Sequence, residues 1–114
     1  ALECEDGMVH SGCNVENASY GGTICAERNA ITNMAANGMR QIKKIAIVGG
    51  FADGSGDNSA LLPPCGICRQ VIREFGNPET CEVLLAPLEN LNQITVMKFA
   101  DLLPLSFGPD NLEK

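Results

Sequence analysis

Short apolar runs separated by turn residues open the chain. Residues 1–4 and 8–13 carry mostly apolar side chains, and Glu5-Asp6-Gly7 lies between them. An Asp-Gly pair between two such runs is a strong signal for a β-hairpin. We therefore expect an antiparallel pair of strands first. A loop should follow over residues 14–22, where neither helical nor strand periodicity is present.

The next apolar positions recur every four residues, which is a helical spacing. Ala26, Ala30 and Met34 form an apolar stripe, and this stripe predicts a helix over residues 24–37. Thr23 stands just before it and is the residue that we expect to cap its amino end.

A continuous apolar run and a second helical stripe follow. The run Ile42–Val48 is typical of a strand that is buried on both faces, as in a sheet covered by helices. Residues 49–59 are rich in Gly, Asp and Ser and predict a solvated connector. The pair Pro63-Pro64 favours the start of a helix, which the apolar spacing extends over residues 65–75.

The last third of the chain alternates short apolar runs with turn residues. We expect a strand over residues 81–86, a weaker one over 93–97, a helical turn over 99–103 and a loop-like tail over 105–114. The order β-β-α-β-α-β-β predicts an α/β fold in which helices pack on a sheet, and residues 1–114 form a single domain.

Charge and hydropathy argue against two classes of partner. Eight basic residues stand against 14 acidic ones, and Lys43-Lys44 is the largest basic cluster, so the chain would repel a phosphate backbone. No run approaches the roughly 20 apolar residues of a membrane span, and the amino end lacks the pattern of a secretion signal. We expect a soluble, cytoplasmic protein with no nucleic-acid or membrane partner.

Six cysteines in a short chain are compatible with a disulfide framework, but their spacing favours a metal site. Cys65 and Cys68 lie three residues apart at the start of a predicted helix, so their sulfurs share one face. Cys25 begins the other predicted helix. Three thiolates leave the fourth tetrahedral position of Zn²⁺ open, which distinguishes a catalytic zinc from a structural one. The other three cysteines are expected to be small buried side chains: Cys4, Cys13 and Cys81.

A carboxylate and two arginines stand next to the candidate ligands. Glu27 is placed to move protons between water and substrate, although a first-turn glutamate can instead merely complement the helix dipole. Glu27 and Cys25 converge only if the site lies beyond the helix end, since residues two apart do not share a helix face. Arg28 and Arg69 are placed to donate to the sulfurs, and an ordinary surface ion pair is the alternative for Arg28.

The pattern Cys25-Ala26-Glu27 followed by Pro64-Cys65-Gly66-Ile67-Cys68 is the layout of zinc-dependent nucleobase deaminases. A redox pair would need neither the third cysteine nor the glutamate. Together with the run Asn14–Tyr20 and the tail Leu103–Pro109, it makes the chain closely resemble the small, three-cysteine, homotetrameric cytidine deaminases of pyrimidine salvage. The resemblance implies a three-layer α-β-α sandwich around a mixed five-stranded sheet.

The resemblance also implies a reaction. Cys25, Cys65 and Cys68 would hold one Zn²⁺ per subunit, and water activated there would attack C4 of cytosine. Glu27 would be the general acid/base that protonates N3 and then the departing amine. Cytidine and 2′-deoxycytidine would thus be hydrolysed to uridine and 2′-deoxyuridine, with release of ammonia.

Nucleoside contacts are implied in the same way. The residues that match Asn14 and Glu16 bind the ribose 3′-hydroxyl in the family, and an amide and a carboxylate one strand period apart point the same way. Simple turn formation is the alternative. The residues that match Ala18 and Tyr20 contact the nucleoside from a neighbouring subunit, and the one that matches Phe107 closes over it from another chain. The active sites would then be shared within a homotetramer.

The sequence departs from the family at its amino end. Family members carry a helix before the first strand, which packs on the sheet and brings an aromatic residue to the nucleoside pocket, and nothing here corresponds to it. Either the sequence is truncated before this helix or the protein has lost it, and a loss would uncover one face of the sheet and weaken stability and substrate stacking. His10, the only histidine, lies in the predicted hairpin away from the metal motif and is expected to be structural.

Three other functions stay open at this point. A deaminase of the same scaffold acting on another aminopyrimidine nucleoside, such as blasticidin S, is disfavoured by the intact run Asn14–Tyr20. A deaminase of nucleic acids needs a positive surface that this acidic chain lacks. A non-catalytic domain in which zinc only joins two helices would tolerate the loss of the Glu27 carboxylate.

Overall fold

The structure is a computed structural model that describes residues 1–51, 53 and 55–112. Of the predicted loops, residues 52, 54, 113 and 114 lie outside the described residues. The remaining residues form strands, helices and short 3-10 turns in this order: β1 (Leu2–Cys4), β2 (Val9–His10), η1 (Tyr20–Gly22), α1 (Ala26–Ala36), β3 (Ile42–Ile47), α2 (Gly66–Phe75), β4 (Glu82–Leu85), β5 (Thr95–Lys98), η2 (Phe99–Asp101) and η3 (Pro109–Asn111).

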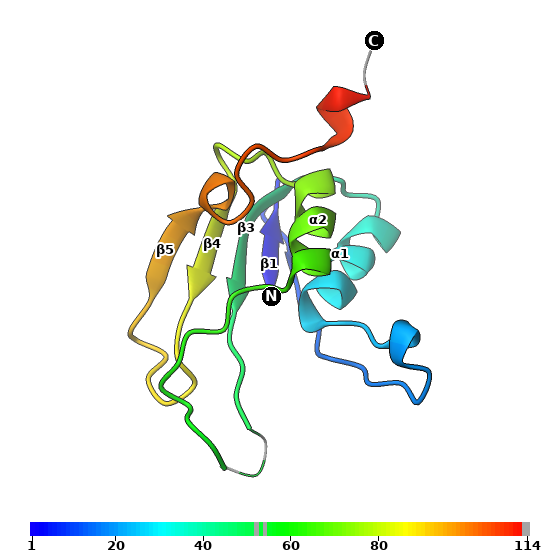
Figure 1. Ribbon diagram of the computed structural model, residues 1–114. Helices are drawn as coiled ribbons and strands as arrows, with labels where there is room; N and C mark the ends of the chain where they lie inside the picture. Colours follow the sequence, from blue (N-terminus) through cyan, green and yellow to red (C-terminus); the bar gives the residue numbers. More distant parts are fainter. Residues whose placement is uncertain (52, 54, 113–114) are drawn as a thin grey trace.

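The strands form one mixed sheet in the order β2-β1-β3-β4-β5 (Figure 1). The hairpin β1–β2 is antiparallel, as predicted, and β1 also pairs antiparallel with β3. The pair β3–β4 is parallel, and β5 adds an antiparallel edge. Because parallel neighbours need a long crossover, the segment between β3 and β4 has room for a helix, and this helix is α2.

Both predicted helices are confirmed, but their first residues differ from the prediction. α1 begins at Ala26 with Cys25 as its N-cap, and Thr23 is not the cap. The Thr23 hydroxyl instead accepts a hydrogen bond from the Asn17 N–H at 3.1 Å, within the preceding loop. α2 likewise has Cys65 as its N-cap, so Pro63-Pro64 precedes the helix rather than forming its first turn.

The tail is more ordered than predicted. Residues 105–114 were expected to be loop-like, but Pro109–Asn111 forms the 3-10 turn η3. The Gly108 N–H donates to Oδ1 of Asn111 at 2.7 Å, which satisfies the first free donor of this turn.

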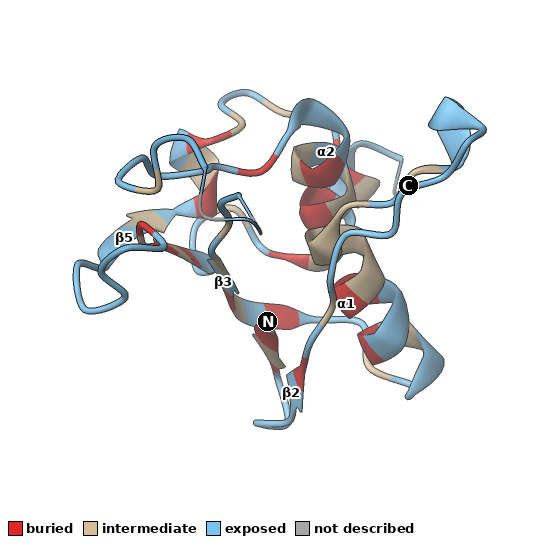
Figure 2. Ribbon diagram, turned by 90° about the horizontal axis from the view of Figure 1, so that it is seen from below, coloured by how far each residue is buried: buried red, intermediate tan, exposed pale blue. Residues whose placement is uncertain are grey.

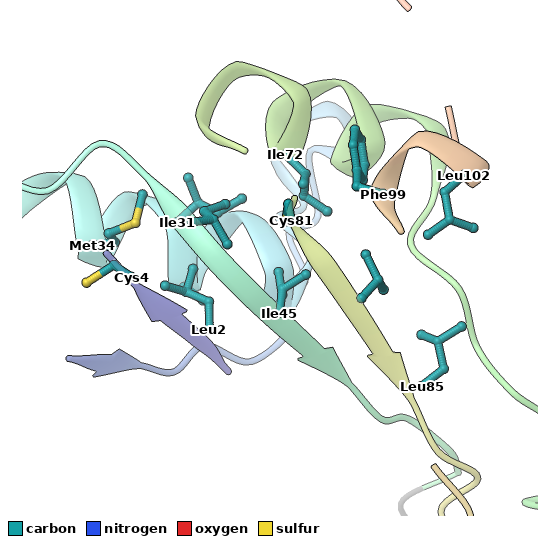
Figure 3. Close-up of a cluster of buried hydrophobic side chains, with 13 residues drawn as sticks. Leu2, Cys4, Ile31, Met34, Ile45, Ile72, Cys81, Leu85, Phe99 and Leu102 are labelled. Carbon is teal, nitrogen blue, oxygen red and sulfur yellow. The ribbon is translucent and has the colours of Figure 1, made fainter. Parts of the chain in front are cut away.

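The hydrophobic core lies between the two helices and one face of the sheet. Ile31 of α1 and Ile72 of α2 are both fully buried, and they meet Leu2 and Ile45 from the strands (Figure 3). Phe99, just after β5, closes one end of this core. The helical stripe that was read from the sequence is therefore the packed face of α1.

The opposite face of the sheet is open in the described part of the chain. Both α-helices lie on one side of the sheet (Figures 1 and 2). Ala46 is exposed, so the prediction that its strand is buried on both faces is wrong. The mixed five-stranded sheet and the α/β class are confirmed. The described residues supply one of the two helical layers of the predicted three-layer sandwich.

A row of alternating charges crosses the open face. Lys44 lies opposite Glu3 on one side and Glu82 on the other, and Glu82 lies opposite Lys98. Opposite charges on neighbouring strands stabilise strand pairing modestly.

Neither described helix has the length and apolar character needed to cross a membrane.

Candidate metal centre and active site

The structure brings the three predicted metal ligands together. The sulfurs of Cys25, Cys65 and Cys68 all lie within 4.8 Å of one another, and the Cys25 and Cys65 sulfurs are 3.9 Å apart. Zn–S bonds of about 2.3 Å at tetrahedral angles put two sulfurs roughly 3.8 Å apart. The donor set and its spacing therefore fit Zn²⁺.

Helix geometry explains why these sulfurs converge. Cys25 and Cys65 are the N-caps of α1 and α2, one position earlier than the predicted first turn, and Cys68 lies in the first turn of α2. The two helices pack on each other. A cap residue stands at the helix end, where free N–H groups and the helix dipole favour a thiolate. Two helix amino ends thus present three sulfurs to one point.

The two cysteines of α2 differ in their environment. The backbone N–H of Cys68 lies near the Cys65 sulfur and lowers the pKa of Cys65. Burial raises the pKa of Cys68, and the negative charge of Glu27 contributes to the same rise. Cys68 is fully buried whereas Cys65 is exposed, which accounts for the opposite directions. A cation bound at the cluster would favour the thiolate form of both.

Arg28 lies beside the cluster, as predicted. Its Nη2 atom donates to the Cys25 sulfur at 3.7 Å and to the Thr23 carbonyl at 3.3 Å. Contacts with the Cys25 and Cys68 sulfurs raise the pKa of Arg28. Its Nε atom is buried and finds no acceptor among the described residues. The guanidinium is therefore placed to offset the negative charge of the thiolates.

Arg69 makes different contacts from those predicted. Its Nε atom donates to the Pro64 carbonyl at 2.8 Å, and its Nη1 atom donates to the Leu102 carbonyl at 2.7 Å. These carbonyls take the donors that were expected to face the sulfurs. Arg69 thus connects the entrance of α2 to the chain after β5.

Glu27 borders a cavity, and its charge acts on the cysteine cluster. The cavity has a volume of about 390 Å³ and is lined by Glu27 and Ala26 of α1, by Gly12, and by apolar residues at the ends of β3 and β4. The Glu27 side chain is half-buried, and its charge raises the pKa of Cys68. The carboxylate is therefore within electrostatic reach of the sulfurs and borders an apolar space.

Gly12 allows this close packing. A β-carbon at Gly12 would lie 2.5 Å from both the Ala26 carbonyl oxygen and the Ala30 nitrogen. Only a residue without a side chain lets the segment after β2 press against the first turn of α1. This contact fixes the start of α1, where Cys25 and Glu27 are located.

Asn14 is tied to the same helix turn. Its Oδ1 atom accepts the Ala26 N–H at 2.8 Å, and Val15 pairs with Ile24 through two backbone hydrogen bonds of 2.9 and 3.0 Å. The Nδ2 atom of Asn14 takes no part in the bond to Ala26 and can donate to a ligand. The amide of Asn29 adds a bond to the Cys13 carbonyl at 2.7 Å.

The structure does not bring every predicted site residue to the cluster. Glu16, Ala18 and Tyr20 are exposed on the loop before α1, and Tyr20 is 90% exposed. Phe107 is 59% exposed on the tail. Figure 1 shows the loop beside the start of α1 and the tail leaving past the carboxyl end of α2. His10 is buried in β2 opposite Leu2.

Sequence reasoning missed the side chains that hold these segments. Asn29 lies inside α1, although asparagine is a poor helix former. Its position in the middle of a predicted helix was the only indication in the sequence that its side chain has a structural role. Gln70 donates to the Phe107 carbonyl at 2.9 Å. Arg73 is buried and bonded to Ser106 and Asp110. No local sequence pattern around Arg73 indicated such distant partners.

Comparisons with known proteins agree with this geometry. Residues 1–84 match the family model described as the cytidine and deoxycytidylate deaminase zinc-binding region. The cytidine deaminase of Sporosarcina psychrophila is 41% identical over 112 residues, which cover 98% of this chain and 75% of that protein. A cytidine deaminase from Mycobacterium tuberculosis is 39% identical over 110 residues, and this matched region covers 96% of this chain and 71% of that protein.

Solved structures give the same result. The crystal structure of cytidine deaminase from Burkholderia pseudomallei matches this chain with a TM-score of 0.78 and 42% identity. The matched region covers 94% of this chain and 78% of the B. pseudomallei chain. The crystal structure of the M. tuberculosis enzyme matches with a TM-score of 0.68 and 34% identity. The matched region covers 95% of this chain and 76% of the M. tuberculosis chain. The three cysteines could hold one metal ion, and the matched region of the family is a zinc-binding region. The chain therefore belongs to the zinc-dependent cytidine and deoxycytidylate deaminases.

Proposed function

We propose that this protein hydrolyses cytidine and 2′-deoxycytidine to uridine and 2′-deoxyuridine, releasing ammonia, as a step of pyrimidine salvage. One observation carries the proposal: three cysteine sulfurs within 4.8 Å of one another, with the half-buried Glu27 beside them. Three protein ligands leave room for a fourth, exchangeable one. A purely structural zinc would be closed by four.

The cysteines and Arg28 prepare the site. Cys25, Cys65 and Cys68 hold one Zn²⁺ per subunit as thiolates. Bound zinc supplies Lewis acidity, which lowers the pKa of a water molecule toward neutrality. Because three thiolates on a divalent ion leave a net negative charge, they weaken this effect. Arg28, which donates to the Cys25 sulfur at 3.7 Å, withdraws part of that charge.

Glu27 moves the protons. Its carboxylate accepts a proton from the attacking water and delivers it to N3 of the cytosine ring, which makes C4 electrophilic as the C4–O bond forms. It then takes the proton of the new C4 hydroxyl and delivers it to the 4-amino group, so that the C4 carbonyl forms as the C4–N bond breaks and ammonia leaves. Glu27 is suited to this role because it borders the apolar cavity and remains close to the sulfurs.

Asn14 and Glu16 bind the ribose. The 3′-hydroxyl can donate one hydrogen bond and accept others, which matches a carboxylate acceptor and an amide donor. The Oδ1 atom of Asn14 is held by the Ala26 N–H at 2.8 Å. This bond orients the amide group beside the first turn of α1, so the ribose and the reacting ring are positioned from one helix end.

The active site is completed between subunits of a homotetramer. Ala18 and Tyr20 contact the nucleoside from one neighbour, and Phe107 closes over it from another. The exposure of Tyr20, Leu105 and Phe107 supports this arrangement, because large apolar side chains held in solvent indicate an interaction surface. Six free cysteines favour a reducing compartment such as the cytoplasm.

The direct test is the loss of cytidine absorbance with and without a strong chelator. We expect deamination that stops on metal removal and returns with added Zn²⁺. Blasticidin S should be assayed side by side, since ammonia release from the antibiotic alone would replace our substrate with another. A protein that binds zinc but releases ammonia from neither compound would support a non-catalytic domain.

Mixed tetramers test the sharing of sites. Glu27→Gln subunits lack the acid/base but carry Phe107, and Phe107→Ala subunits have the reverse defect. Co-expressed with different tags and purified for both, they should show a fraction of sites with the wild-type KM. If Phe107 served its own subunit, only the KM of the Phe107→Ala variant would be present.

A further inference from the structure

Three neighbouring side chains of α2 hold the segment from Leu102 to Asp110. Arg69 donates to the Leu102 carbonyl at 2.7 Å, and Gln70 donates to the Phe107 carbonyl at 2.9 Å. Arg73, one helical turn after Arg69, donates to the Ser106 hydroxyl at 2.8 Å and to Asp110 at 2.6 Å. The tail is thus bonded at several points to the helix that supplies Cys65 and Cys68.

Arg73 is an unusual residue for a helix of this kind. It is 8% exposed and is the one buried Arg, Lys, Asp or Glu in the part of the chain that the structure describes. A buried guanidinium is unfavourable unless hydrogen bonds and an opposite charge compensate it. Both compensating groups, Ser106 and Asp110, belong to the tail. The fold therefore keeps this cation buried only while the tail is attached.

Gly108 shows how closely the two parts fit. Its backbone is extended, with φ −153° and ψ −174°, a conformation that any residue adopts. A β-carbon at this position would nevertheless overlap the Arg73 guanidinium. A side chain at position 108 would therefore force the Arg73 guanidinium to move from its place beside Ser106 and Asp110.

The anchored segment presents two apolar side chains to solvent. Leu105 is fully exposed, and Phe107 is 59% exposed. Leu105 also has a φ of +48°, in the left-handed region that leucine seldom adopts. Such a conformation persists where the surrounding structure over-determines it. The bonds to Leu102, Ser106 and Phe107 on either side provide that constraint.

We propose that Arg73 is a positioning residue that, through Ser106, Asp110 and Gly108, fixes the tail so that Phe107 reaches the nucleoside bound in an adjoining subunit. The proposal rests on the role of Phe107 in the proposed function. Arg73 acts on substrate affinity from the carboxyl-terminal half of α2, whereas the metal ligands of the same helix lie at its amino end. One helix thus serves two active sites.

Steady-state kinetics with a matched control tests the kinetic part. In Arg73→Ala the KM for cytidine should rise about tenfold, the effect expected when a well-packed aromatic contact is lost. We expect a bound-zinc ratio and subunit number equal to wild type and a kcat changed by less than about threefold. Arg40→Ala is the control, because Arg40 is an exposed arginine that bonds only to nearby carbonyls of Ala35 and Met39.

A fluorescence measurement tests the positioning independently of activity. The chain has no tryptophan, so Phe107→Trp introduces one tryptophan per subunit, on the tail, which can be excited selectively over Tyr20. Combining it with Arg73→Ala should add a fast nanosecond decay of anisotropy, and combining it with Arg40→Ala should not. If Arg73→Ala does not fold, Asp110→Ala removes only the exposed partner and should give the same change in smaller degree.

A double-mutant cycle separates this role from general stability. Gly108→Ala should raise KM in the wild-type background, where the new methyl group meets the guanidinium. It should have little further effect in Arg73→Ala. An Arg73→Ala enzyme with unchanged KM and unchanged anisotropy overturns the inference while leaving the proposed function intact. A Phe107→Ala enzyme with unchanged KM would overturn the role of Phe107 itself.

Discussion

The helix amino ends and the two exposed segments of this protein are built in opposite ways. At the helix ends, three sulfurs and Arg28 are held by caps and first-turn geometry, and Cys68 is fully buried. The loop before α1 and the tail present Tyr20 and Phe107 to solvent. The metal cluster is thus contained in one chain, whereas the proposed function has Tyr20 and Phe107 contact a nucleoside bound to a neighbouring subunit. Substitutions at the helix ends should therefore lower kcat, whereas substitutions in the exposed segments should raise KM.

Removing a buried ligand should have the largest effect. Cys68→Ala leaves two thiolates, so the variant should lose zinc, and its turnover should fall below detection. Its melting temperature should also drop, because metal-binding free energy contributes to folding. Cys13→Ala is the control: the prediction that Cys13 is buried is wrong, and it is an exposed free thiol outside the cluster. Metal analysis, melting curves and turnover should be compared, and full zinc occupancy in Cys68→Ala would contradict the assignment.

Replacing the acid/base should spare the metal but not the chemistry. Glu27→Gln keeps the side-chain shape and should retain zinc, while kcat falls by roughly 10²–10⁴-fold. Glu74→Gln is a suitable control because Glu74 is exposed on α2. Near-normal turnover in Glu27→Gln would remove Glu27 from the mechanism and leave it only as one of the residues that line the cavity.

Local spacing explains how much of the site could be predicted. Cys65 and Cys68 lie three residues apart, so any helix places their sulfurs on one face. The apolar stripe of Ala26, Ala30 and Met34 likewise predicted α1, with an error of two residues at its start. That error had a physical cause, because the Thr23 hydroxyl is used by Asn17. The meeting of Cys25 with the α2 cysteines depends on helix packing, so local spacing could not show it; the layout of the cysteines and Glu27 along the chain predicted it, and the family resemblance implied it as well.

Long-range polar contacts were beyond the reach of sequence patterns. Arg73 is separated from Ser106 by 33 residues and from Asp110 by 37, and no periodicity links such partners. The same holds for Arg69, which was expected at the sulfurs and instead bonds the Leu102 carbonyl. The exposure of Ala46 also could not be derived, because a continuous apolar run does not show which of its faces is covered.

The ribose contact offers a smaller and more specific effect. Asn14→Ala should raise the KM for cytidine about tenfold through the lost hydrogen bond to the sugar. It should also lower the melting temperature slightly, since the Ala26 N–H loses its acceptor. With 3′-deoxycytidine, which lacks the hydroxyl, wild type and Asn14→Ala should have similar KM values. An equal loss on both substrates would mean that Asn14 acts only by supporting α1.

The attachment of the tail should depend on pH only in acid, and this is the smallest expected effect. A hydrogen bond from Arg73 holds the pKa of Asp110 below its ordinary value of 3.8. A carboxyl group whose pKa is lowered by folding contributes stability above its unfolded-state pKa, and this contribution is lost as the pH falls through the folded-state pKa. The anisotropy of Phe107→Trp should therefore be constant from neutral pH down to about pH 5 and should decrease below 3.8. In Asp110→Asn the acid step should disappear, because the amide does not titrate in this range. A step of equal size in both proteins would show that acid releases the tail through a different group.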